Sequence, residues 1–202
     1  MEIPSQTDSP SHLLAAIYLV AEQFASFDDF LCLHVIYKPT PLKDLFDMVW
    51  RLISTSMHRP SISIVQAGLI LLLKTPLDRF ALDRPFKWSL LGSIITMAQT
   101  LGLHLNPEGW RIPYHEIQLR RRLSWIIFVV EKWFALSFGS PSNLTEDNWS
   151  IVQVHVKMGP NSNVEMEESQ QILELSRLTA ILSSVLQQLL SVCLLKGRYD
   201  RR

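Results

Sequence analysis

Three consecutive arginines, Arg120, Arg121 and Arg122, form the only such run in the sequence. Arginine binds phosphates and carboxylates, so the run could contact nucleic acid or an acidic protein. Consecutive helical residues do not share a face, and Glu116 stands four residues before Arg120, in the order that favours an ion pair. The 19 basic and 19 acidic residues also balance, whereas a nucleic-acid surface needs clustered positive charge. We therefore interpret the arginines as surface charges that pair with Glu116 and with loop carboxylates.

Two short segments match parts of catalytic motifs. His115 and Glu116 begin the zinc-binding pattern of metalloproteases, which needs a second histidine four residues after the first, but position 119 is Leu119. The segment Gly139-Ser140-Pro141-Ser142 lacks the second glycine of a nucleophile elbow. No local motif supports catalysis, and we predict that the protein is not an enzyme.

The sequence has two cysteines, Cys32 and Cys193, which lie far apart and form no Cys-x-x-Cys pair. This pattern is typical of a reducing compartment and excludes a multi-cysteine metal cluster built from this chain alone. Cys32-Leu33-His34 has no second pair of ligands, so core packing is the simpler interpretation. We expect no cofactor and no metal in this chain.

The tryptophans offer a different chemistry, because aromatic rings can line a small-molecule pocket as well as fill a core. Core packing is the simpler interpretation, and any buried indole N–H then needs a partner. His104, two residues after Gly102, could hydrogen-bond a helix end or sense a ligand. The tryptophans concerned are Trp88, Trp110, Trp125, Trp133 and Trp149.

The elements that must position these residues are helices. Apolar residues recur at three and four positions through most of the chain, and strand patterns are nearly absent. The spacing predicts an all-α protein of about seven helices, arranged as a multi-helix bundle or as stacked helical hairpins, with little or no sheet. Ser11 is a candidate N-cap, and Gly102 and Gly139 suit helix ends. The predicted helices cover residues 11–24, 27–37, 42–57, 61–74, 86–101, 113–138 and 167–195.

The longest of these helices, over 113–138, shows one apolar face. The face would turn inward in a helical protein. Residues 151–157 alternate weakly and could be extended, and residues 158–164 have loop composition. The predicted inward positions of the long helix are Leu119, Leu123, Ile126, Ile127, Val130, Trp133, Phe134 and Ser137.

Two windows without charge, Trp88–Pro107 and Leu178–Leu195, approach the length of a membrane span. Their polar residues fall in regular stripes at helical spacing, which favours helices with one wetter face over lipid-facing spans. We expect no membrane contact. The stripes consist of Ser89, Ser93, Thr96 and Thr100 in the first window and of Ser184, Gln187, Gln188 and Ser191 in the second.

The length and composition suit one domain with one core. We expect a disordered N-terminus over residues 1–11, a single domain over residues 12–196 and a basic tail over residues 197–202. The start carries Glu2 and Asp8 but no basic residue, unlike a secretory signal.

Several short motifs occur in a fixed order over roughly residues 40–195. Together they resemble the middle homology region of fungal zinc binuclear-cluster transcription factors. Glu131-Lys132 stands where that family often has Asp-Arg, and Gly139-Ser140-Pro141 where it has Gly-Arg-Pro. The residues that carry the resemblance are Gln66, Gly92, Gly102, His104, Trp110, Glu116, Arg120, Arg121, Arg122, Trp125, Glu131, Lys132, Gly139 and Pro141.

The chain also departs from the family pattern. Ser124 replaces the first tryptophan of a Trp-Trp pair, Asn106 replaces a common aspartate, and Ser140 replaces the arginine of Gly-Arg-Pro. The pattern RRLSW, EKW, SPS is similar to that of nitrogen-utilisation regulators within the family. The six-cysteine DNA-binding cluster cannot be formed by two cysteines, so zinc is expected only in an upstream module that this chain lacks.

The resemblance implies a regulatory domain, acting in the nucleus on RNA polymerase II transcription through contacts with other protein segments or the transcription machinery. DNA binding by this chain itself is not expected. Two alternatives stay open: a helical small-molecule-binding or enzymatic domain with a tryptophan-lined pocket, and a truncated fragment without function. Because the family's domain usually continues further, we predict exposed apolar side chains at Leu175, Leu182, Val185 and Leu189.

Overall fold

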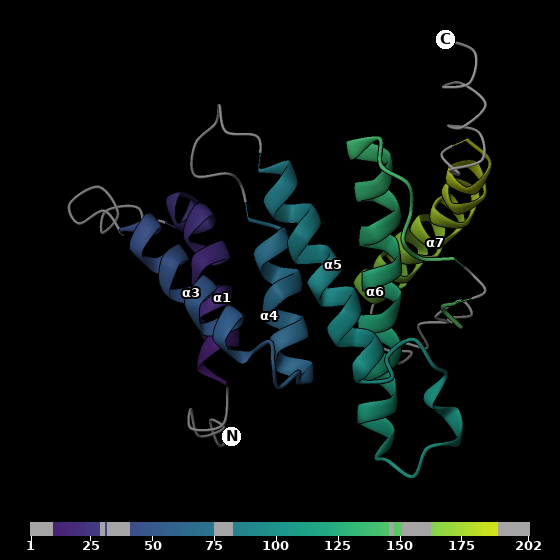
Figure 1. The fold of residues 1–202 in the computed structure, drawn as a ribbon, viewed down its shortest axis with the longest axis horizontal. Helices are drawn as coiled ribbons and strands as arrows, with labels where there is room; N and C mark the ends of the chain where they lie inside the picture. Colours follow the sequence, from purple (N-terminus) through teal and green to yellow (C-terminus); the bar gives the residue numbers. More distant parts are fainter. Residues whose placement is uncertain are drawn as a thin grey trace. The chain divides into compact units, whose positions relative to one another are not determined.

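The computed structural model describes residues 10–28, 31, 41–74, 83–145, 148–150 and 163–189. These ranges are mainly helical and contain no strand (Figure 1). The predicted all-α class is confirmed, and the number of helices in these ranges is close to the prediction. The α-helices are α1 (Ser11–Ala21), α3 (Leu42–Ser56), α4 (Ile62–Leu72), α5 (Arg84–Thr100), α6 (Tyr114–Phe138) and α7 (Asn163–Leu189), and the 3₁₀ helices are η1 (Glu22–Phe27) and η2 (Pro107–Gly109).

The helices form two compact units. The N-terminal unit, Met1–Leu101, contains α1, η1, α3, α4 and α5, and the C-terminal unit, Gly102–Arg202, contains η2, α6 and α7. The predicted N-terminal segment 1–11 lies almost wholly outside the described residues, and the basic tail 197–202 lies outside them entirely. The limits of the predicted domain stay a prediction.

Helix α4 is the centre of the N-terminal unit. It contacts α1, α3 and α5, and Figure 1 shows it between α5 and the pair α1 and α3. Its sequence is apolar nearly all round, and Val65 and Leu72 are among its buried residues. Gly68 allows close packing, because a Cβ atom there would lie 3.0 Å from the side chain of Ile94 on α5. The predicted helical assignment of this segment is confirmed.

Helix α1 starts differently from the prediction. Ser11 is its first helical residue and not its N-cap, and the carbonyl of Pro10 accepts the amides of Leu13 and Leu14. The capping serine in this unit is Ser61, whose hydroxyl accepts the amide of Ile64 at 3.4 Å at the start of α4.

Helix α5 carries the first predicted polar stripe. Its hydroxyls donate to carbonyls four residues earlier, as Thr96 does to Gly92 at 3.0 Å and Thr100 to Thr96 at 2.9 Å. The helix begins at Arg84, two residues before the predicted start, with Pro85 in its first turn, where proline is tolerated. None of the helices in the described part of the chain is long and apolar enough to cross a membrane.

The C-terminal unit pairs α6 with α7. Gly102 and Gly139 have positive φ angles of 71° and 64°, as predicted for helix ends, and Gly139 caps α6. Helix α7 begins at Asn163, four residues before the predicted start, so part of the expected loop is helical. Its predicted end, most of the predicted helix 27–37 and the segment 151–157 lie outside the described residues.

One face of α7 is covered and the neighbouring face is exposed. Leu182 and Leu186 are buried, so the prediction of an exposed Leu182 is wrong. Leu178, Ile181 and Val185 are exposed instead, and the predicted exposure of Val185 is confirmed. Leu175 is half-buried, and the side chain of Leu189 is outside the described set.

Candidate functional site

The polar centre of the C-terminal unit is a buried pair of charges. Glu131 and Lys132 are neighbours on α6, with 0% and 2% of their surfaces exposed. The apolar pattern predicted Ile126 and Trp133 on the inward face of this helix, but both are exposed. Leu123 and Ile127 are buried as predicted. The inward face therefore lacks Ile126 and Trp133, and it includes two ions that the apolar pattern did not predict.

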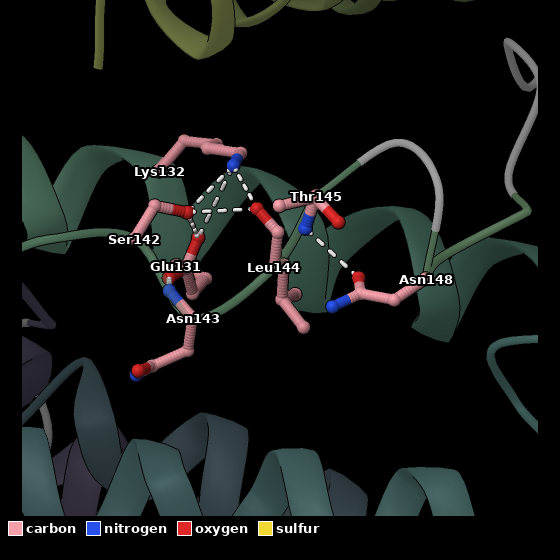
Figure 2. A network of polar contacts seen from close by, with 7 residues as sticks. All are labelled: Glu131, Lys132, Ser142, Asn143, Leu144, Thr145 and Asn148. Atoms are coloured by element: carbon pink, nitrogen blue, oxygen red, sulfur yellow. Dashed lines mark hydrogen bonds and ion pairs between the residues drawn. The ribbon is translucent and has the colours of Figure 1, made fainter. Parts of the chain in front are cut away.

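Figure 2 shows these two side chains reaching the loop that follows α6. Lys132 Nζ donates to Ser142 Oγ at 2.6 Å and to the carbonyl of Leu144, and it lies 3.7 Å from Glu131 Oε2. Ser142 Oγ donates to Glu131 Oε2 at 2.8 Å, and the amide of Asn143 donates to Glu131 Oε1. We call these five residues the clamp.

The hydrogen bonds of the clamp offset the unfavourable free energy of burying two ions. Removing two ions from water is unfavourable unless each finds hydrogen bonds as well as the opposite charge. Here the carboxylate of Glu131 accepts hydrogen bonds from the Asn143 amide and the Ser142 hydroxyl. Lys132 Nζ also lies 5.0 Å from the ring centroid of Phe128. Glu131 and Lys132, which stand where the resembled family often has Asp-Arg, therefore hold the loop after Gly139 against α6.

A second group of motif residues supports the turn before α6. The ring of Trp110 lies against Gly102, where a Cβ atom would come within 2.9 Å of it. The guanidinium of Arg120 lies 5.2 Å from the centroid of that ring and binds Glu116 Oε1 at 2.9 Å. The predicted pair of Glu116 and Arg120 forms, and its arginine also covers the tryptophan.

The three arginines have different surroundings. Arg121 binds the carboxylate of Glu108 in η2 and donates to Asn106 Oδ1 at 3.3 Å. The hydrogen bond that Glu108 accepts from Arg121, and then the one that it accepts from Asn106, hold the pKa of the Glu108 carboxyl below its usual range. Arg122 is exposed, and the described residues provide it with no ion-pair partner. The arginines thus do not form one contact patch.

Two serines also donate hydrogen bonds to backbone carbonyls of the turn before α6. Ser124 is buried, and its hydroxyl donates to the carbonyl of Leu103, which accounts for a small polar residue at this position of α6. The amide and the hydroxyl of Ser150 both donate to the carbonyl of His104, at 3.0 and 2.8 Å. Sequence reasoning found neither contact, because the partners are 21 and 46 residues apart.

Two tryptophans connect α6 to α7. Trp125 Nε1 donates to Ser176 Oγ at 3.0 Å, and Trp133 Nε1 donates to Thr179 Oγ1 at 3.1 Å. A shallow groove of about 500 Å³ lies beside this helix, and its described lining comes from α7 and contains no tryptophan. The lining residues are Gln170, Gln171, Glu174, Leu175 and Leu178.

Three further motif residues are Gln66, Gly92 and Pro141. Gln66 is half-buried on α4 and Gly92 is on α5, both in the N-terminal unit. A Cβ atom on Gly92 would meet nothing within 4 Å. Pro141 is exposed beside the clamp, and His115 is exposed at the start of α6.

The number of possible metal ligands limits which zinc site this chain could form. In the part of the chain that the structure describes, no three His, Cys, Asp or Glu side chains gather as metal ligands. The two cysteines are too few for a six-cysteine cluster, whatever their position.

The described residues are all-α, and several charged and aromatic motif residues, among them Trp110, Arg121 and Lys132, fasten the chain's own turns and loops. The profile of the fungal specific transcription factor domain matches residues 4–195, across both units. The chain therefore belongs to the fungal specific transcription factor domain family.

Three relatives are regulators of transcription or activators by name. The uncharacterized transcriptional regulatory protein C25B8.11 of Schizosaccharomyces pombe is 27% identical over 91% of this chain and 27% of its own length. The transcriptional activator protein DAL81 of Saccharomyces cerevisiae is 32% identical over 69% of this chain and 14% of its own length. The activatory protein CHA4 of the same yeast is 27% identical over 56% of this chain and 18% of its own length.

The chain thus spans about a quarter or less of the relatives it matches. No solved structure matches the chain.

Proposed function

We propose that this chain is a regulatory domain of a fungal transcription factor, which acts in the nucleus and modulates RNA polymerase II transcription through protein contacts. It carries out no catalysis and does not bind DNA by itself. The observation that carries the proposal is the family match over residues 4–195, in a chain similar to proteins named as transcriptional regulators and activators. Kinship with nitrogen-utilisation regulators stays a prediction from the RRLSW, EKW and SPS segments.

The contacts of the arginines support the absence of DNA binding. A DNA-binding surface neutralises several phosphates with clustered basic side chains. Arg120 and Arg121 already pair with carboxylates of the same unit, and Arg122 points from a different side of α6. A zinc-containing DNA-binding module would have to come from residues outside this chain.

The alternative of a tryptophan-lined pocket has less support. The ring of Trp110 covers Gly102. The indole N–H groups of Trp125 and Trp133 donate hydrogen bonds to hydroxyls on α7. These rings act as packing and connecting groups, and the groove on α7 has none of them in its described lining.

Fluorescence anisotropy with labelled duplex DNA at physiological salt tests this proposal. We expect binding no tighter than the non-specific range, about 10⁻⁶ M or weaker, for any sequence. Sequence-specific binding tighter than about 10⁻⁷ M, with a salt dependence that decreases in R122A, would show that the chain contacts DNA directly.

A further inference from the structure

Among the described residues of the C-terminal unit, two buried nitrogen atoms have no hydrogen-bond partner: His104 Nδ1 and Trp149 Nε1. Trp149 is 2% exposed, and its ring centroid lies 6.1 Å from that of His104, with the ring planes tilted by 50°. Both residues belong to segments that the two hydrogen bonds from Ser150 to the His104 carbonyl hold together.

A buried hydrogen-bond donor without an acceptor destabilises the folded protein. The indole N–H can only donate, and leaving it without an acceptor costs roughly 1–3 kcal/mol. More than about nine in ten buried polar groups in native proteins have a partner, either protein or ordered water. Two such atoms on adjacent rings therefore indicate one shared partner from outside the described side chains.

The rings of His104 and Trp149 are neighbours, with centroids 6.1 Å apart. One oxygen atom within hydrogen-bond distance of both nitrogens would be the simplest shared partner. The bridging atom must accept a hydrogen bond from Trp149 Nε1. It can accept from His104 Nδ1 or donate to it, according to the tautomer of the imidazole.

We propose that His104 and Trp149 form a binding site for one oxygen atom, which belongs to a buried water molecule or to a hydroxyl, carbonyl or carboxylate of a small organic ligand. The site lies beside the Gly102 turn, where Ser150 binds the His104 carbonyl. An organic ligand here would couple its binding to the attachment of the 148–150 segment. This inference does not depend on the proposed regulatory function.

Nuclear magnetic resonance of the full chain labelled with ¹³C and ¹⁵N tests the site. W149F identifies the Trp149 indole signal while keeping an aromatic ring in place. Substituting the other tryptophans one at a time gives the same assignment by elimination if W149F does not fold. We expect the Trp149 indole proton to exchange with solvent at least about ten-fold more slowly than that of free tryptophan.

The source of the oxygen is distinguished in the same samples. A cross-peak from the indole proton to water, which persists when S150A removes the nearby hydroxyl, identifies a bound water. A cross-peak to a proton that no assigned residue of the chain accounts for identifies a co-purified organic ligand, whose mass is then measured by mass spectrometry of the denatured sample. Fast indole exchange, or slow exchange with cross-peaks to protein protons alone, would overturn the proposal.

Discussion

Lys132 Nζ and Ser142 Oγ lie 2.6 Å apart, and through this contact the buried end of α6 holds the loop that follows it. The same hydroxyl donates to Glu131, so one serine contacts both members of a buried ion pair. Neither ion would be tolerated at this depth without such partners. The clamp therefore makes the burial of both ions in the C-terminal unit tolerable.

Substituting Lys132 by methionine tests the clamp. The variant leaves Glu131 buried without its cation, and we expect a loss of about 3–5 kcal/mol in the free energy of unfolding. S142A should lose about 1–3 kcal/mol, which provides a measurable value if K132M does not fold. Urea denaturation followed by circular dichroism measures both.

The matched control is E174Q. Glu174 forms an exposed pair with Arg177 on α7, and such pairs contribute little, so its unfolding free energy should stay within about 0.5 kcal/mol of the wild-type value. An equal effect of K132M and E174Q would show that the clamp does not stabilise the protein.

Alanine at three glycines should give three different results. G92A is expected to stabilise the protein by about 0.5–1 kcal/mol, because it improves a helix interior and meets no atom within 4 Å. G139A should cost about 1 kcal/mol for its positive φ, in open space. G102A should cost about 2 kcal/mol or more, because its Cβ also meets Trp110.

Thermal unfolding of the three variants gives the order of their stabilities. If G102A proved as stable as G139A, the ring of Trp110 would not lie against the Gly102 turn in solution.

Much of this architecture is predictable from local chemistry. The apolar α4, Gly102 and Gly139 at positive φ, and the pair of Glu116 and Arg120 each depend on residues within a few positions of one another. Helical spacing and backbone freedom are properties of such short stretches. The helix class and the ends of α5 and α6 therefore agree with the prediction to within about two residues.

The buried polar residues of α6 could not be predicted from local sequence. The hydropathy of Glu131 and Lys132 assigns them to the surface, and only their partners in the loop after α6 make burial tolerable. Ser124 looks like a departure from a motif until the carbonyl of Leu103 is placed beside it. Contacts of this kind join residues that the sequence pattern treats independently.

The arginines of the run should contribute differently to the stability of the protein. R120A removes the ion pair with Glu116 and the cover of Trp110, and we expect a loss of about 1 kcal/mol. R122A should change the unfolding free energy by less than about 0.5 kcal/mol. Guanidinium denaturation measures the difference, and a larger loss in R122A than in R120A would contradict the contacts described for α6.

His12 should give the N-terminal unit a pH-dependent stability. Its Nε2 lies 2.9 Å from Ser63 Oγ, which links α1 to α4, and burial lowers the pKa of the imidazole. The unfolded chain then binds more protons than the folded one as the pH falls below the ordinary histidine value of about 6.5. The stability that the neutral His12 contributes is therefore fully present above the ordinary histidine pKa. It is lost as the pH falls through the lowered pKa of the folded state.

Urea denaturation at about pH 7.5 and about pH 5.5 measures this effect. The wild-type protein should lose more stability between the two conditions than H12Q, which has no titrating group at this position. Identical losses in both proteins would show that His12 is equally easy to protonate in the folded and unfolded states.

The most direct test of a regulatory domain is transcription itself. The chain would be fused to a DNA-binding module from another protein and expressed in yeast with a reporter that carries the sites of that module. We predict a reporter output that differs from that of the module alone, is retained in E174Q and is lost in K132M, whose clamp is broken. A wild-type fusion that is folded and abundant, yet leaves the reporter at the level of the module alone, would contradict the account.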